Sequence, residues 1–176
     1  MKTMSVNGVA YTVIKLLGHG KGGYSYLAER NGTQFVLKQI HHEPCAYYQF
    51  GNKIESEKLD YDRLLPTGIR MPKMLDIDLD QERILKEYIS GATIAELVER
   101  DAMKEDYLYQ VQHMADLVRE HNLNIDYFPT NFVVSEGLLY YIDYECNEYQ
   151  SQWDFENWGI QYWSKTPEFL AYLANK

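Results

Sequence analysis

The stretch NIDYFPTN, residues 124–131, decides how this chain is interpreted. It follows an amphipathic run and places an acid, Asp126, close to Pro129 and Asn131. A second acid, Asp143, follows apolar residues in LLYYIDYE. Asp and Asn are common turn formers and Pro129 by itself predicts a turn, so a turn without chemistry is an open alternative here.

Composition limits the classes of protein to which the chain can belong. Its 176 residues predict one domain, or one domain made of two lobes, and 45% hydrophobic residues are enough for a core. Acidic residues outnumber basic ones by 26 to 17, which gives a net charge of −9. We therefore expect neither nucleic acid nor an anionic membrane as the main partner. A nucleotide remains compatible, because positive charge can be placed locally.

Cysteine usage and the N-terminal sequence predict the cellular compartment. The two cysteines, Cys45 and Cys146, are far apart and form no CxxC pattern, which favours reduced thiols over a disulfide. The N-terminus lacks the features of a signal peptide. No apolar run approaches the roughly 20 residues that a membrane span needs. A soluble cytoplasmic protein is expected.

Three β-rich runs are found in the N-terminal part: VAYTVIKLL (9–17), YSYLAE (24–29) and QFVLKQI (34–40). Asn31-Gly32 lies between the second and third runs, and this dipeptide is a strong signal for a β-hairpin. The chain is therefore predicted to begin with an antiparallel sheet.

A glycine-rich segment, GHGKGG, separates the first two of these strands, and Gly18, Gly20 and Gly23 form a GxGxxG pattern. A dinucleotide-binding fold would require a helix directly after it, whereas a hairpin follows here. Without Cβ atoms the turn can instead lie close to phosphates and offer backbone N–H groups. Lys38, on the next strand, is then a candidate contact to α- and β-phosphates. The alternative is a strand lysine that points to solvent.

A helix is predicted over about 52–65, and its apolar face contains Ile54, Tyr61, Leu64 and Leu65. Glu57 has the spacing to face inward with them, whereas Glu55 points elsewhere. An inward glutamate needs a cation, and Lys38 is the natural candidate. The alternative for Glu57 is a solvated helix acid.

The rest of the chain predicts strands at 66–77 and 83–91, helices at 93–100 and 104–121, and a second hairpin of 131–134 and 138–142. Thr93 and Glu96 form a capping box at the start of the first of these helices. The second helix carries an apolar stripe that is typical of a core: Leu108, Val111, Met114, Ala115 and Val118.

Taken in order, these segments resemble the protein-kinase-like superfamily, which includes protein kinases and antibiotic and choline kinases. DYFPTN is similar to the catalytic loop Asp-Leu-Lys-Pro-Glu-Asn, with matches at Asp126, Pro129 and Asn131. IDYE resembles the metal-binding Asp-Phe-Gly, and more closely the Asp-Phe-Glu of the small-molecule kinases. KEYISG resembles the hinge between lobes. The resemblance covers about residues 14–150.

The resemblance implies an α+β, two-lobed protein-kinase-like fold. An antiparallel-sheet N-lobe would occupy about 1–88, and a truncated, mainly helical C-lobe about 89–176. It also implies an enzyme that uses ATP and Mg²⁺ and moves the γ-phosphate to a hydroxyl of a protein Ser/Thr or of a small molecule.

The resemblance further implies a role for each site residue. Asp126 would be the catalytic base, and Asn131 and Asp143 would bind Mg²⁺. Lys38 would hold the phosphates and be oriented by Glu57. The remaining positions would bind the nucleotide. Its phosphates would be covered by the turn of Gly18, Gly20 and Gly23, and its adenine would lie near Glu87 and Tyr88.

The sequence also departs from the family pattern. The histidine and arginine of the protein-kinase catalytic loop correspond to Asn124 and Ile125, and loss of that arginine suggests no activation by loop phosphorylation. Glu145 replaces the glycine of Asp-Phe-Gly, and the chain ends soon afterwards at Lys176. A non-catalytic nucleotide-binding pseudokinase or scaffold module therefore stays open as an alternative.

Three evenly spaced tryptophans, Trp153, Trp158 and Trp163, lie near the C-terminus. With Asp154 in the place of a structural acid, the segment resembles the one that follows the metal aspartate in choline kinases. An aromatic set there holds a cationic ligand through cation–π attraction. The favoured alternative is that these tryptophans pack the C-terminal region.

Overall fold

The computed structural model describes residues 2–43 and 52–176, so Cys45 lies outside the described residues. The chain is mixed α+β and divides into two compact units. Unit 1 comprises Met1–Leu59 and Pro72–Tyr88, and unit 2 comprises Asp60–Met71 and Ile89–Lys176. Among the described residues, no helix has the length and apolar character needed to cross a bilayer.

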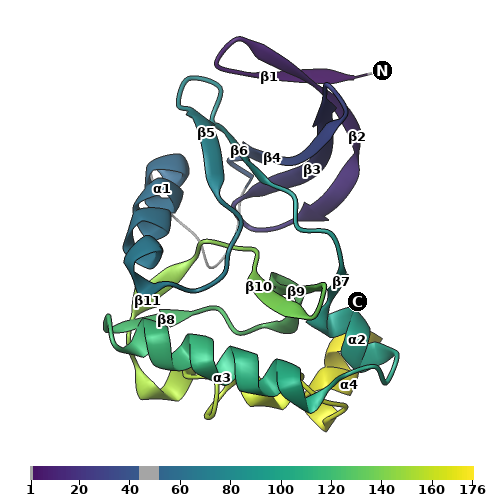
Figure 1. The fold of residues 1–176 in the computed structure, drawn as a ribbon, viewed down its shortest axis with the longest axis vertical. Helices are drawn as coiled ribbons and strands as arrows, with labels where there is room; N and C mark the ends of the chain where they lie inside the picture. The colour runs from purple at the N-terminus through teal and green to yellow at the C-terminus, as the bar shows by residue number, and fades with distance from the viewer. Residues whose placement is uncertain (1, 44–51) are drawn as a thin grey trace. The chain divides into compact units, whose positions relative to one another are not determined.

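Six antiparallel strands form the curled sheet of unit 1 (Figure 1). In chain order they are β1 (Thr3–Val6), β2 (Val9–His19), β3 (Gly23–Arg30), β4 (Thr33–Ile40), β5 (Met74–Asp78) and β6 (Arg83–Glu87). Their order in the sheet is β1-β2-β3-β4-β6-β5. The predicted antiparallel sheet and the three N-terminal strands are confirmed.

Two of the hairpins in unit 1 turn at an Asn-Gly dipeptide. Asn31 and Gly32 both have positive φ, of 52° and 79°, which is the conformation that a tight hairpin between twisted strands requires. Asn7 and Gly8, with φ of 48° and 82°, form the same turn between β1 and β2. β1 was not predicted, although Asn7-Gly8 carries the same signal.

The helix α1 (Lys53–Leu64) confirms most of the predicted helix. Ile54 packs with Ile40 and Ile84 in unit 1. Leu65 is an exception, because its side chain is 52% exposed and lies in the 3-10 helix η1 (Leu65–Thr67). Pro66 lacks an N–H group and disfavours helical geometry in the residue before it, so α1 ends here.

The predicted strand at 66–77 was too long at its N-terminal end. β5 begins only at Met74, because η1 occupies Leu65–Thr67 and Gly68 follows with a φ of 80°. A second proline, Pro72, lies before the strand and cannot donate to a sheet ladder.

Unit 2 contains three α-helices among its described residues: α2 (Ile94–Glu99), α3 (Glu105–Arg119) and α4 (Pro167–Ala174). Its strands are β7 (Ala92–Thr93), β8 (Leu123–Ile125), β9 (Phe132–Ser135), β10 (Leu138–Tyr141) and β11 (Cys146–Glu148). They form two small sheets, β10-β9-β7 and β11-β8. The unit also contains the end of α1 from Asp60 onward, η1, and three further short 3-10 helices: η2 (Pro129–Asn131), η3 (Ser151–Trp153) and η4 (Gly159–Tyr162).

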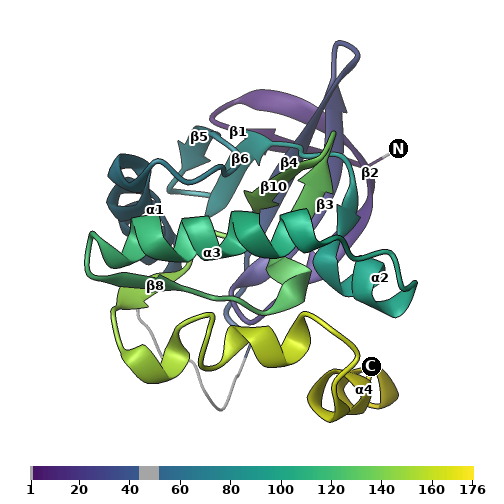
Figure 2. The same cartoon turned by 60° about the horizontal axis from the view of Figure 1, so that its bottom comes forward.

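The helix predictions for unit 2 are confirmed. The Thr93 side chain accepts a hydrogen bond from the Glu96 N–H, and the Glu96 carboxylate accepts one from the Thr93 N–H. The apolar stripe of α3 is buried except for Leu108, which is partly buried, and Tyr107 joins it. α3 lies along β8, as Figure 2 shows, and covers the core of unit 2.

Candidate functional site

The glycine turn between β2 and β3 is fixed at its far end by close contact with β4. A Cβ atom on Gly23 would lie 2.5 Å from the carbonyl oxygen of Gln39, so only glycine fits there. The Gly20 N–H donates to the Gly23 carbonyl at 3.0 Å, and the His41 N–H donates to the Gly22 carbonyl at 3.2 Å. The fold by itself therefore explains the glycine at position 23.

Gly18 and Gly20 have no such explanation within the structure. A Cβ atom on either residue would meet no described heavy atom within 4 Å, apart from its chain neighbours. Neither residue has positive φ. Neither crowding nor backbone conformation therefore requires glycine at these positions. Without side chains there, the backbone of the turn is open to close approach by another molecule.

Lys38 on β4 and Glu57 on α1 form an ion pair in unit 1. The Lys38 Nζ lies 2.6 Å from the Glu57 Oε1, and the side chains are only 14% and 12% exposed. This confirms the predicted pairing and the inward orientation of Glu57. Glu55 is exposed, as predicted. The phosphate contact of Lys38 stays a prediction.

The surroundings of this ion pair connect it to the glycine turn. A Cβ atom built on Gly22 would lie 3.8 Å from the Lys38 Nζ, so the ammonium group lies directly beside the turn. Within the described residues, the Glu57 Oε2 is buried and accepts no hydrogen bond. A buried acceptor without a hydrogen bond is costly, so this oxygen requires a specific explanation.

Glu87 and Tyr88 lie at the end of β6. The Glu87 carboxylate accepts a hydrogen bond from the Lys73 N–H at 2.6 Å, and the Glu87 N–H donates to the Lys73 carbonyl at 3.0 Å. Glu87 therefore fixes the segment that leads into β5. Tyr88 is half-buried. The predicted proximity of both residues to adenine stays a prediction.

In unit 2, Asp126 begins a turn directly after β8. The Asp126 Oδ1 accepts a hydrogen bond from the Phe128 N–H at 3.1 Å, and the Asn131 Nδ2 donates to the Asp126 carbonyl at 3.3 Å. The turn predicted from Pro129 is thus present. Because the Asn131 amide nitrogen donates within the turn, its oxygen points the other way.

The hairpin of β9 and β10 brings Asp143 to this turn. The Ile142 N–H donates to the Asn131 carbonyl at 2.9 Å, and Asp143 is the next residue. The Asp143 Oδ1 accepts a hydrogen bond from the Tyr144 N–H at 2.7 Å. Unit 2 therefore gathers the three polar residues predicted from the sequence, although the intervening chain is a complete hairpin.

Tyr141, which was not predicted as a site residue, connects these segments. Its buried hydroxyl accepts a hydrogen bond from the Asp126 N–H at 3.1 Å and donates one to the Glu145 carbonyl at 2.7 Å. Burial raises the pKa of Tyr141 well above its ordinary value, and the negative charges of Asp143 and Asp126 add to this shift. The hydroxyl thus keeps its proton and its role as a donor. The alternation of Leu139 and Tyr141 in the strand was the signal that these side chains point inward.

Residues near the C-terminus also hold in place the turn that begins at Asp126. The Trp163 indole N–H donates to the Tyr127 carbonyl at 2.7 Å. A Cβ atom on Gly159 would lie 2.5 Å from the Tyr127 Cβ, so glycine is required there. The packing interpretation of the tryptophans is confirmed for Trp163, which is buried, whereas Trp153 is 49% exposed.

Asp154 lies in the same region and is a buried acid. It accepts hydrogen bonds from the Tyr149 hydroxyl at 2.9 Å and from the Phe155 N–H at 2.8 Å. Arg119 lies 3.9 Å away, close enough for an ion pair. These contacts give Asp154 the structural role that the sequence indicated.

We expect Trp163→Phe to destabilise the protein by about 2 kcal/mol. The substitution removes the buried indole N–H that donates to the Tyr127 carbonyl, and it leaves a small cavity. For a chain of this size, the melting temperature should fall by roughly 4–8 °C, measured by calorimetry. Trp153→Phe, at the exposed position, is the matched control and should change it little. Equal losses in the two variants would contradict the assigned role of Trp163.

Comparison of the sequence with protein-family models and with curated proteins found no match. We therefore base the functional proposal on the contacts within each unit and on the chemistry of the side chains involved.

Proposed function

We propose that this chain is an ATP- and Mg²⁺-dependent phosphotransferase with a two-lobed protein-kinase-like fold, which moves the γ-phosphate of ATP to a hydroxyl group of a protein or a small molecule. The observation that carries the proposal is the Lys38–Glu57 ion pair beside the glycine turn in unit 1. The proposal assigns the N-lobe to about 1–88 and the C-lobe to about 89–176. The compact units differ from this assignment at residues 60–71, which group with unit 2.

The ion pair has the chemistry that a phosphate contact needs. A buried carboxylate holds the Lys38 ammonium in one orientation, so less side-chain entropy is lost when phosphate binds. Backbone N–H groups at an open glycine turn can donate to phosphate oxygens without obstruction by side chains. Gly18 and Gly20, which the fold itself does not require, are the glycines that would allow this approach.

The oxygen atoms of Asn131 and Asp143 suit Mg²⁺, which prefers hard oxygen ligands and is commonly held by one or two protein groups together with substrate phosphates. When bound, the ion would offset the negative charge of the phosphates. The Asn131 Nδ2 already donates to the Asp126 carbonyl, so the amide oxygen is the atom that would bind the ion. We assign both residues to the metal.

Asp126 is proposed as the base that accepts the proton of the acceptor hydroxyl. Its position is set by two backbone contacts, since its N–H donates to the Tyr141 hydroxyl and its Oδ1 accepts from the Phe128 N–H. A carboxylate held in this way is preorganised for proton transfer. Glu87 and Tyr88 are proposed to lie near the adenine.

A non-catalytic nucleotide-binding module is the second candidate. It is favoured by the residues that stand in the places of the protein-kinase histidine and arginine. The Asn124 Oδ1 accepts a hydrogen bond from the Gln150 N–H at 2.7 Å, and Ile125 is buried. Both residues therefore serve the packing of unit 2. This candidate predicts nucleotide binding without phosphoryl transfer.

We expect MgATP to raise the melting temperature, because a ligand that binds only the folded state stabilises it. At a concentration of about 100 times Kd the gain is roughly 2.7 kcal/mol, which corresponds to about 5–10 °C for a chain of this size. Calorimetry with and without Mg²⁺ measures the effect. Lys38→Met should abolish most of it, and Glu55→Gln should retain it. Absence of both a melting shift and binding heat at millimolar MgATP would overturn the proposed function.

A further inference from the structure

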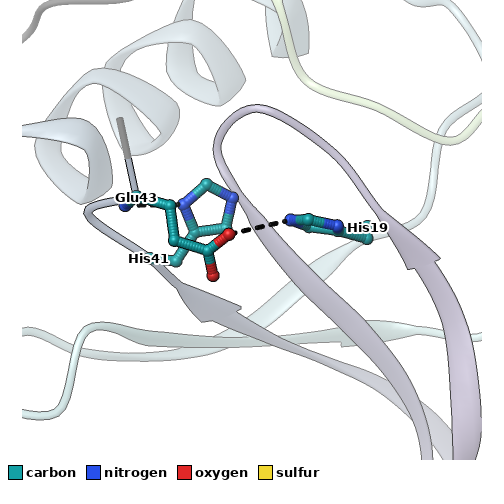
Figure 3. A group of neighbouring side chains, drawn as sticks. All are labelled: His19, His41 and Glu43. Carbon is teal, nitrogen blue, oxygen red and sulfur yellow. Dashed lines mark hydrogen bonds and ion pairs between the residues drawn. The ribbon is translucent and has the colours of Figure 1, made fainter. Parts of the chain in front are cut away.

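Two histidines and a glutamate meet at the glycine turn of unit 1, as Figure 3 shows. His19 ends β2, whereas His41 and Glu43 directly follow β4. One nitrogen or oxygen atom from each of the three lies within 4.8 Å of the other two. The His19 Nε2 is 3.5 Å from the Glu43 Oε1. Nothing in the proposed function uses these three side chains.

The hydrogen bonds of His41 determine which of its nitrogens carries the lone pair. Its Nε2 lies 2.7 Å from the Gly20 carbonyl oxygen, which can only accept, so Nε2 bears the proton and donates. Its Nδ1 accepts a hydrogen bond from the Glu43 N–H at 3.2 Å and therefore carries the lone pair. Histidines that bind metals typically donate their other ring N–H to a carbonyl or carboxylate, which is the arrangement of His41.

Tyr24 fixes the other two members of the cluster. Its hydroxyl donates to the Glu43 Oε2, which leaves Oε1 on the side of His19. Its ring stacks on His19, with centroids 4.2 Å apart and planes 10° from parallel. The three side chains thus have outer partners that hold them. Figure 3 shows the Glu43 carboxylate on the side of His19, to which the dashed line runs.

We propose that His19, His41 and Glu43 form a binding site for a divalent transition-metal ion, with Zn²⁺ as the best match. Two imidazoles and one carboxylate are a common protein ligand set for Zn²⁺, and a water completes the four-coordinate geometry. Bonds of about 2.0–2.2 Å in a tetrahedral site place donor atoms roughly 3.4 Å apart. The distance of 3.5 Å between the His19 Nε2 and the Glu43 Oε1 already matches this value.

The remaining adjustment is small and falls on side chains that are about half exposed. Donors that are up to 4.8 Å apart must approach by up to about 1.4 Å. The side chains of His19 and Glu43 are 47% and 48% exposed, which leaves room for this small rotation. The ion would replace the weak contact between the His41 Nδ1 and the Glu43 N–H. Mg²⁺ is a poor candidate because it prefers an octahedral set of oxygens.

A metal at this site would connect the end of β2 to the segment after β4 across the glycine turn. The turn is otherwise held by backbone hydrogen bonds such as that from the His41 N–H to the Gly22 carbonyl. Bound metal therefore stabilises unit 1 and restricts the turn. This inference does not depend on the proposed function.

The test is a calorimetric titration of the full chain with ZnCl₂. The titration is repeated with Co²⁺, whose visible spectrum reports tetrahedral coordination by nitrogen and oxygen ligands. His19→Ala and Glu43→Gln are the test variants. His42→Ala is the matched control, because His42 is the next residue after His41 and lies instead 2.7 Å from Glu82. Cys45→Ser, at a position outside the described residues, tests a contribution from the thiol that follows Glu43 by two residues in the sequence.

We expect one equivalent of Zn²⁺ to bind, with an excess of Mg²⁺ not competing. Each test variant should lose more than the roughly 10–100-fold in affinity that loss of an outer-shell partner costs. His42→Ala and Cys45→Ser should bind as the unmodified chain does. Circular dichroism checks that all variants are folded. The proposal is overturned if folded His19→Ala binds Zn²⁺ with unchanged affinity, if Cys45→Ser abolishes binding, or if no Zn²⁺ binds.

Discussion

Asp126→Asn should lower phosphoryl transfer by roughly 10²–10⁴-fold and leave the affinity for MgATP unchanged, because general-base catalysis contributes an effect of about this size. The substitution preserves the structure of the turn. Asparagine keeps an Oδ1 that can accept the hydrogen bond from the Phe128 N–H, and the backbone N–H still donates to Tyr141. What is lost is the ability to take a proton.

Asp143→Asn is the matched comparison. The amide can still accept the hydrogen bond from the Tyr144 N–H, so the local fold is retained. Removal of the negative charge should nevertheless weaken Mg²⁺-dependent nucleotide binding, because a neutral amide is a poorer ligand for a hard cation than a carboxylate. Binding is measured by calorimetry, and transfer by labelling of the chain itself and by slow release of phosphate to water.

The two variants separate binding from transfer. Equal loss of nucleotide binding in folded Asp126→Asn and Asp143→Asn would show that the assigned roles are wrong. Binding without any transfer by the unmodified chain, to itself or to water, would favour the non-catalytic module.

Lys38→Met should lower nucleotide affinity or turnover by about 10²–10³-fold, the range expected when one preorganised donor to developing charge is removed. Glu57→Gln should act in the same direction but more mildly, by about tenfold or less, because its amide oxygen still accepts a bond from the lysine while the charge-assisted part is lost. Glu55→Gln should change little, since Glu55 is exposed on another side of α1. MgATP titrations and phosphate release measure all three.

Stability must be measured together with activity in this series. Lys38→Met removes the cation that lies 2.6 Å from the largely buried Glu57 carboxylate, and breaking such a pair is destabilising. The double variant Lys38→Met/Glu57→Gln removes both charges and should recover much of the lost stability without recovering nucleotide binding. Damage by Glu55→Gln with none by Glu57→Gln would contradict the assignment, and so would Lys38→Met with both nucleotide affinity and turnover unchanged.

Local sequence signals predicted several elements of secondary structure in this protein. Asn31-Gly32 predicted its hairpin because both residues tolerate the positive φ that the turn requires. Thr93 and Glu96 predicted the start of α2 through a reciprocal pair of hydrogen bonds within one turn of chain. Helical spacing also indicated that Glu57 can face inward, since a helix fixes the direction of each side chain relative to its neighbours, although a solvated acid stayed open as the alternative.

The fold's long-range contacts could not be predicted in this way. The sequence indicated Lys38 only as a candidate partner of Glu57. The contact itself requires β4 and α1 to pack together. Tyr141 looked like one more strand aromatic, and only the hairpin packing brings its hydroxyl to Asp126. Trp163 looked like either a core residue or a ligand contact, and its hydrogen bond to Tyr127 decided between them for this residue.

The glycine turn shows most clearly what each level determined. The sequence presented Gly18, Gly20 and Gly23 as one pattern, whereas the structure separates them, because only Gly23 is in close contact with β4. His19 likewise had no visible connection to His41 and Glu43 until two strands placed them side by side. Turn and helix signals depend on neighbouring residues and are therefore written in the local sequence. Contacts between distant residues depend on how strands pair and pack, so only the tertiary structure decides them.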